Sequence, residues 1–257
     1  MRPLRKRGWR AGPLSTTPTP TLFLIAAGVA ALAAISTGTA TAARHDGGTV
    51  VSPRLALAVL LGPHAAMSAP TLRSDRLQLV SARRPITDER TVLPVIGHRS
   101  GNDGSAWLHV VLPGRPNGHT GWIKQRGTSR STTVWHLVVD TATRRVTVYR
   151  EGRAVRVFKA VVGKPATPTP HGEFFVEEVI QLSAADPGAP YALALSARSN
   201  VLQEFEGGPG QIALHGLMNV GGVLGSAASH GCVRLANDAM RWLVIRISPG
   251  VPVTITR

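Results

Sequence analysis

The chain has 257 residues, and its 29 lysines and arginines against 14 acidic residues give it a formal net charge of +15 at pH 7. The hydrophobic share of 43% is that of a globular protein and excludes wholesale disorder, and the length suits one large or two smaller domains. Aromatic residues make up only 5% and are scattered, which argues against a nucleic-acid-binding protein and leaves anionic polymers or lipid surfaces as partners for the charge.

The first 42 residues have the three parts of a secretory signal peptide. Residues 1–10 are basic, Leu22–Ile35 form an apolar run, and Ala40–Ala42 fit the small-residue cleavage pattern. The apolar run has 14 residues, short of the roughly 20 that a membrane-spanning helix needs. We therefore predict a secreted protein in the cell wall or a periplasm-like space, with an uncleaved membrane anchor as the alternative.

After the signal peptide, residues 43–73 are predicted to be a linker with one short apolar stretch. Residues 74–126 alternate short β-like runs with turn residues, a pattern typical of a small β-barrel. Asn117 and Gly118 predict a hairpin between two of these runs.

The hairpin region, Trp107 to Ile123, resembles bacterial Src-homology-3-type modules, which accompany many cell-wall enzymes. Trp107 and Trp122 are interpreted as core residues of this module, because a large aromatic ring is most simply accommodated in the core.

Residues 126–133 are polar and are predicted to be a second linker, followed by a mainly β domain over 133–257. Its strands are expected in the β-branched runs, which include 173–180, 191–196 and 211–215. One helix is predicted to start at Asn237 or Asp238 as N-cap and to continue through Ile247.

Cys232 is the only cysteine of the sequence, so in an exported protein it has no intramolecular disulfide partner. A thiol becomes a nucleophile as the thiolate, which requires a nearby base. His230 stands two residues away, a spacing that makes in-line proton transfer difficult, whereas His215 ends a separate predicted strand. His215 is therefore the predicted base, with the carbonyl of Gly216 as a group that orients its ring.

Gly231 precedes the thiol and permits backbone conformations that other residues avoid. Its N–H, together with that of Cys232, is a candidate oxyanion hole for an acyl intermediate. A lone cysteine with such neighbours favours acyl transfer over redox chemistry, which normally uses two cysteines.

Two segments in the expected order resemble the L,D-transpeptidases of the YkuD family. HGLMNVGGVLGSAASHGCVRL, His215 to Leu235, is similar to their active-site signature, and VGKPATPTPHGEF, Val162 to Phe174, is similar to a loop upstream of it. The resemblance covers roughly the last 125 residues of the sequence. It implies a β-sandwich-like catalytic fold with one main helix after the nucleophile and no metal or cofactor.

The resemblance also implies roles for individual residues. Cys232 matches the acylated nucleophile, His215 the base and Gly216 the residue whose carbonyl orients that base. Ser229, His230 and Gly231 then line the substrate and oxyanion site. Arg234 replaces an asparagine of one family branch, and either binds a carboxylate of the substrate or braces the loop of the active site.

The implied substrates are peptidoglycan stem peptides, as donor and as acceptor, with anionic wall polymers as further partners. Cys232 would attack a tetrapeptide stem and release D-alanine, and an acceptor amine would resolve the thioester into a 3→3 crosslink. An L,D-carboxypeptidase and a non-catalytic wall-binding protein are the alternatives.

Two other interpretations concern a zinc site and the remaining histidines. His215, His230 and Cys232 are also the residue types of a zinc site, although such sites normally have a more regular ligand pattern. The remaining histidines are interpreted as surface or loop residues, namely His45, His64, His98, His109, His119, His136 and His171.

Overall fold

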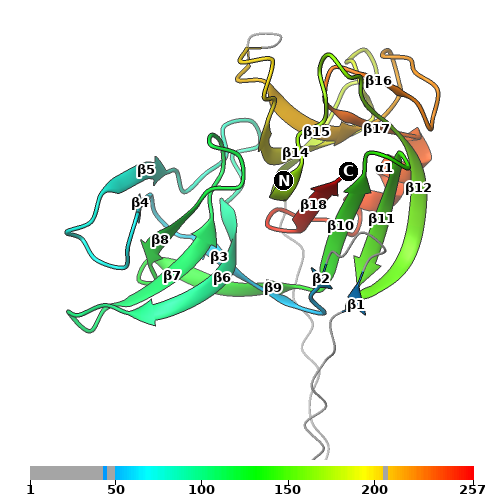
Figure 1. The fold of residues 1–257 in the computed structure, drawn as a ribbon. Helices are drawn as coiled ribbons and strands as arrows, with labels where there is room; N and C mark the ends of the chain where they lie inside the picture. The colour runs from blue at the N-terminus through cyan, green and yellow to red at the C-terminus, as the bar shows by residue number, and fades with distance from the viewer. Residues whose placement is uncertain (1–42, 45–49, 205–207) are drawn as a thin grey trace, which may run out of the picture. The chain divides into compact units, whose positions relative to one another are not determined.

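The computed structural model describes residues 43–44, 50–204 and 208–257. The predicted signal peptide and His45 lie outside these residues. The fold is mainly β, as predicted, with two large sheets and a short ladder of β1 (Ala43–Arg44) and β2 (Val50–Val51) (Figure 1).

The N-terminal sheet is antiparallel and has seven strands in the order β5-β4-β8-β7-β6-β3-β9. Within the described residues no pairing joins its two edge strands. The strands are β3 (Leu55–Leu60), β4 (His64–Met67), β5 (Arg76–Val80), β6 (Val92–Ser100), β7 (Ala106–Val111), β8 (Thr120–Lys124) and β9 (Thr128–Thr133).

This sheet includes strands from both segments that were predicted to be linkers. The predicted linker 43–73 contains β3 and β4, and the predicted linker 126–133 contains β9. β9, with the sequence TSRSTT, looks like a loop because it is polar, yet it pairs along its whole length with β3. Strand pairing overrides the weak local preference of such a segment.

Inside this sheet, the predicted hairpin and the core position of Trp107 are confirmed, whereas the predicted core position of Trp122 is not. Asn117 and Gly118 lie in the hairpin between β7 and β8, and Gly118 has the positive φ of 70° that the turn requires. Trp107 is buried, whereas Trp122 is only partly buried and stacks on His109.

The C-terminal sheet closes on itself. Eight strands follow one another in the order β11-β10-β18-β13-β14-β15-β17-β12, and β12 pairs back to β11, so they form a mixed barrel; β16 adds to β12 outside this ring. The strands are β10 (Trp135–Asp140), β11 (Arg145–Arg150), β12 (Arg153–Gly163), β13 (Gly172–Gln181), β14 (Tyr191–Arg198), β15 (Gln211–His215), β16 (Ala227–Ser229), β17 (Val233–Leu235) and β18 (Pro252–Thr256).

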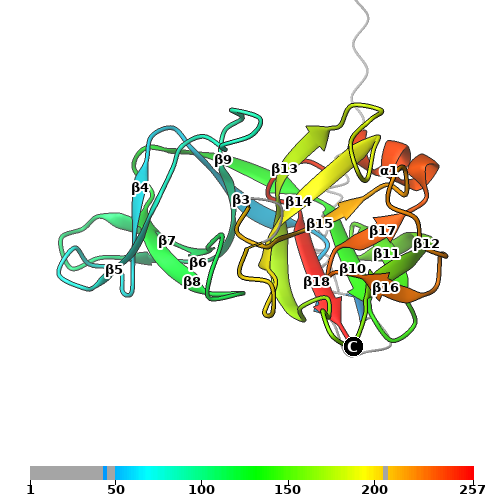
Figure 2. The same cartoon turned by 90° about the horizontal axis from the view of Figure 1, so that it is seen from above.

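The helix after Cys232 is present as α1 (Asn237–Val244), and it packs on the barrel with Ala239, Met240 and Leu243 buried and with contacts to β14 (Figure 2). The predicted N-cap is wrong. Ala236, which has no polar side-chain atom, occupies the N-cap, and Asn237 is the first residue of the helix, with its side chain bonded to Leu217. Within the described ranges no helix is long and apolar enough to cross a membrane.

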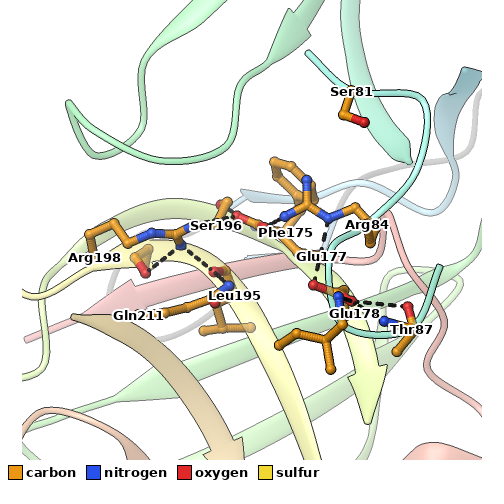
Figure 3. Close-up of polar contacts among 12 residues, drawn as sticks. Ser81, Arg84, Thr87, Phe175, Glu177, Glu178, Leu195, Ser196, Arg198 and Gln211 are labelled. Atoms are coloured by element: carbon orange, nitrogen blue, oxygen red, sulfur yellow. Dashed lines mark hydrogen bonds and ion pairs between the residues drawn. The ribbon is translucent and has the colours of Figure 1, made fainter. Parts of the chain in front are cut away.

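The two sheets contact each other through a buried cluster of charges (Figure 3). Arg84, from the loop after β5, forms ion pairs with Glu177 and Glu178 of β13, and Glu177 also pairs with Arg198 at the end of β14. The side chains of both glutamates are at most 1% exposed. A register shift between Val176 and Glu178 is the local irregularity that lets two consecutive residues of one strand both be buried.

A second contact joins the β7–β8 hairpin to the segment after β14. The Asn117 side chain accepts from the N–H of Arg198 and donates to its carbonyl, at 2.8 and 2.7 Å. Arg115 donates to the carbonyl oxygens of Ser199 and Pro209. The N-terminal sheet is therefore bound to the backbone at both ends of the segment between β14 and β15.

Two of the histidines expected at the surface are buried instead. His64 is bonded to the carbonyls of Gly62 and Arg126, and His136 lies 2.8 Å from the Thr254 hydroxyl. Burial lowers the pKa of His136 to about 4. The carbonyl of Arg126 and the hydroxyl of Thr254 are distant in sequence, so the sequence around these histidines gave no sign of those two contacts.

Candidate active site

Two adjacent parallel strands bring the predicted nucleophile and base together. β15 pairs with β17 so that Leu214 lies beside Val233 and His215 beside Arg234, and Cys232 directly precedes β17. Leu214 and Val233 are fully buried, whereas the flanking His215, Cys232 and Arg234 are partly exposed. Since side chains alternate along a strand, these three lie on one face, away from the barrel core.

The ring of His215, the predicted base, is oriented by its own neighbour. Its Nδ1 donates to the carbonyl of Gly216 at 2.8 Å, because a carbonyl only accepts, and Nε2 is then the ring's acceptor nitrogen. Burial lowers the pKa of His215, the bond to Gly216 opposes this, and the charge of Arg234 adds to the lowering. The imidazole is therefore neutral at neutral pH, the state in which it accepts a proton.

The thiol of Cys232 lies next to the backbone of β15. Its Sγ lies 4.0 Å from the carbonyl oxygen of Gln211, four residues before His215 on the same strand. Cys232 is partly exposed, so a reactant reaches the sulfur from solvent.

Two glycines keep the His215 ring in place, and the sequence pointed to only one of them. Gly188 has a φ of +84°, and a Cβ there would overlap the imidazole. Gly216 donates its N–H to the carbonyl of Gly188 at 2.7 Å, and a Cβ on Gly216 would overlap the carbonyl of Ala189. The turn residues Asp-Pro-Gly at 186–188 were the available sequence signal for this close approach.

The side chain of Asn237 has another role than the helix cap expected from the sequence. Its Oδ1 accepts from the N–H of Leu217 at 2.9 Å, which fixes the chain just after Gly216. The side chain expected to cap α1 therefore supports the segment that carries the predicted base.

The loop of the nucleophile is closed by Ser229, which is fully buried. Its Oγ donates to the carbonyl of Cys232 at 2.5 Å and accepts from the N–H of Gly231 at 3.1 Å. Gly231 has a φ of +124°, a conformation that side chains rarely permit. The Gly231 N–H, expected as an oxyanion donor, is thus engaged inside the loop, and the glycine serves the sharp backbone bend.

The upstream motif, Val162 to Phe174, holds this loop in place through hydrogen bonds. The buried hydroxyls of Thr167 and Thr169 donate to the carbonyls of Ser229 and Gly231, at 3.3 and 2.9 Å. Thr169 Oγ1 also accepts from the N–H of Gly163 at 2.9 Å. The sequence identified this segment but assigned no role to its threonines, since their partners lie over 60 residues away.

The comparisons with known proteins concern the domain that carries this site. The model of the YkuD family, described as the L,D-transpeptidase catalytic domain, matches residues 135–255. Residues 135–255 belong to the YkuD family. The match does not include the N-terminal sheet, whose likeness to Src-homology-3 modules stays a prediction.

The relatives and solved structures that match this chain have low sequence identity to it. The chain is 27% identical over 153 residues to YkuD of Bacillus subtilis, whose name describes an L,D-transpeptidase, covering 60% of this chain and 77% of that protein. It is 28% identical over 121 residues to L,D-transpeptidase 1 of Mycobacterium tuberculosis, covering 42% and 45%. A solved L,D-transpeptidase from Mycobacterium smegmatis aligns with a TM-score of 0.37 at 20% identity, covering 59% and 90%.

In this domain of the YkuD family, Arg234 braces the loop at residues 220–221. Its Nη1 donates to the carbonyls of Val220 and Gly221, both at 3.1 Å. Of the two roles considered from the sequence, the structure shows bracing.

His230 lies at the surface beside Lys164 of the upstream motif, whose Nζ is 3.4 Å from its Nε2. Within the described ranges no three His, Cys, Asp or Glu side chains are grouped as a metal site would require, so the zinc alternative gains no support.

Proposed function

We propose that this protein is a secreted peptidoglycan L,D-transpeptidase with Cys232 as nucleophile and His215 as general base. The observation that carries the proposal is the placement of both residues on one face of the β15–β17 pair, with the His215 ring oriented by Gly216. The family of the domain supports peptidoglycan stem peptides as substrates and an extracytoplasmic location. The basic and apolar segments before residue 42 agree with export.

In the first half-reaction, Nε2 of His215 takes the thiol proton and the Cys232 sulfur attacks the carbonyl carbon that precedes the terminal D-alanine of a donor tetrapeptide. A tetrahedral intermediate forms and then collapses. The C–N bond to D-alanine breaks, His215 returns the proton to the leaving amine, and a thioester on Cys232 remains.

In the second half-reaction, the side-chain amine of another stem attacks the thioester. Neutral His215 removes the proton of the amine, the C–S bond breaks, and the thiol is restored by that proton. The product is a 3→3 crosslink. When water replaces the amine, the same steps give a tripeptide, the outcome of an L,D-carboxypeptidase. The scheme uses only groups of the chain and calls for no metal or cofactor.

Intact mass measurement of the protein tests this proposal. The protein is incubated with a carbapenem and, separately, with a disaccharide-tetrapeptide, and an acyl adduct on Cys232 is expected in both cases. Crosslinked dimer identifies a transpeptidase, whereas tripeptide without dimer identifies a carboxypeptidase. If neither compound acylates the protein, the enzyme proposal fails and a wall-binding protein becomes the better explanation.

A further inference from the structure

Lys164 is a cation beside the nucleophile that the mechanism above does not use. Its backbone is fixed at both ends, since its N–H donates to the carbonyl of Ser229 at 3.0 Å and its carbonyl accepts from the N–H of Thr167 at 2.9 Å. Gly163 also pairs with Ser229 in the β12–β16 ladder. The backbone of Lys164 is therefore held against Ser229, which stands three residues before Cys232.

The ammonium group of Lys164 lies on the solvent side of this loop. Its Nζ is 3.4 Å from Nε2 of His230, an exposed side chain two residues before the thiol. Among the ion pairs of the described residues, none includes Lys164. The charge is therefore not neutralised by a carboxylate of the described residues, and it lies beside His230, two residues before Cys232.

The other cation of the site is already committed. Arg234 donates to two carbonyls of the loop at 220–221, and its Nε is buried. A guanidinium that holds its own loop cannot turn to a substrate without releasing that loop. Of these two cations, Lys164 is then the one available for recognising an anionic group of the substrate.

We infer that Lys164, with His230 beside it, binds the terminal carboxylate of the donor peptide. This rests on the proposed function, in which the donor ends one residue, about 3.8 Å of backbone, beyond the scissile bond. An ammonium with three donors suits such a carboxylate, and a hydrogen bond between two charged groups is among the stronger ones. The contact makes the enzyme select a stem that ends at the fourth residue with a free carboxylate.

The test compares two donors that differ only in this group, a tetrapeptide with a free terminal carboxylate and the same tetrapeptide as the terminal amide. The rate of D-alanine or D-alaninamide release and of thioester formation is measured as kcat/KM. We expect wild type to prefer the free acid, and Lys164→Gln to lose roughly tenfold to a hundredfold on the acid with little change on the amide, as the strength of a charged hydrogen bond implies.

Two further variants separate recognition from general effects of charge or folding. Lys164→Arg keeps the cation and should retain most of the preference. Lys159→Gln removes an exposed lysine of β12, the strand that ends just before Lys164, and should behave as wild type. An unchanged ratio of acid to amide in Lys164→Gln would overturn the inference while leaving the transpeptidase proposal intact. Failure of wild type to react with either donor would instead overturn the proposed function, and this inference with it.

Discussion

The active-site loop and the contact between the two sheets are both buried and polar, but they are held by different kinds of bond. Around Cys232, hydroxyls of Ser229 and Thr169 and main-chain groups make neutral hydrogen bonds. Between the sheets, the charges of Arg84, Glu177 and Arg198 meet out of water. A neutral hydrogen bond contributes about 1 kcal/mol, whereas a buried charge that loses its partner costs several.

The two kinds of bond have different consequences for the protein. Neutral bonds set the position of a nucleophile without adding a charge that would perturb it. The buried charges make the association of the sheets depend on a matching partner, because neither Glu177 nor Glu178 is hydrated in the assembled protein. Variants in the first region should affect the reaction more than the stability, and variants in the second the reverse.

The largest effect on the reaction is expected for Cys232→Ala. Without the sulfur no acyl adduct and no turnover should remain, while the midpoint of thermal unfolding stays near that of wild type because the side chain is small and only partly buried. Intact mass and a thermal melt measure the two properties. Crosslinking that persists in this variant would refute the assigned nucleophile.

The largest effect on stability is expected for Arg84→Met. The substitution leaves Glu177 and Glu178 without their shared cation, so we expect a loss of about 3 to 5 kcal/mol in the free energy of unfolding, measured in urea. Arg83→Met is the matched control, because Arg83 is 52% exposed in its pair with Asp88 and should contribute at most about 1 kcal/mol. Equal losses in the two variants would show that the buried cluster is not what joins the sheets.

A smaller loss of stability, with a loss of activity, is expected for Thr169→Val. The Gly163 N–H and the Gly231 carbonyl lose their common partner, at a cost of about 1 to 3 kcal/mol. The rate of acylation should also fall, since the loop before Cys232 is less well held. Thr143→Val, at an exposed position in the turn between β10 and β11, is the control. Normal acylation in a destabilised Thr169→Val would separate loop support from catalysis.

The smallest effect is a shift of the pH profile. Because burial and Arg234 lower the pKa of His215, the neutral base persists below pH 6.5, and the acidic limb of kcat/KM for acylation should lie below the value of an ordinary histidine. The same lowering stabilises the fold above pH 6.5, and that contribution is lost as the pH falls through the lowered pKa. An acidic limb at or above pH 6.5 in wild type would contradict the assigned environment.

Part of this site could be predicted from the sequence because the relevant signals are local. The single cysteine, with a glycine before it, indicated Cys232 as the nucleophile, and the histidine at the end of an apolar strand indicated His215 as the base. Two motifs in the expected order indicated the family. The contact of His215 with Gly216 was also predictable, since it joins neighbours in the chain.

Other features could not be predicted, because they join segments that are distant in sequence. Asn237 looked like a helix cap and supports Leu217 instead. β9 looked like a linker and is a sheet strand through its pairing with β3. Arg84 lies over 90 residues from Glu177, and neither neighbourhood indicates that the two charges meet.

The sequence by itself determined the mainly β fold and the groups on which the proposed chemistry rests, namely a thiol, an imidazole and a glycine before the thiol. Only the tertiary structure decided how these groups are supported. Thr169 and Ser229 bond to the loop that contains Cys232. Gly188 lies against the His215 ring, and Arg234 bonds to the loop at residues 220–221. The reason is physical. Residue type and strand alternation act over a few positions, whereas the partner of a buried hydroxyl or charge is set by which strands the closed barrel places side by side.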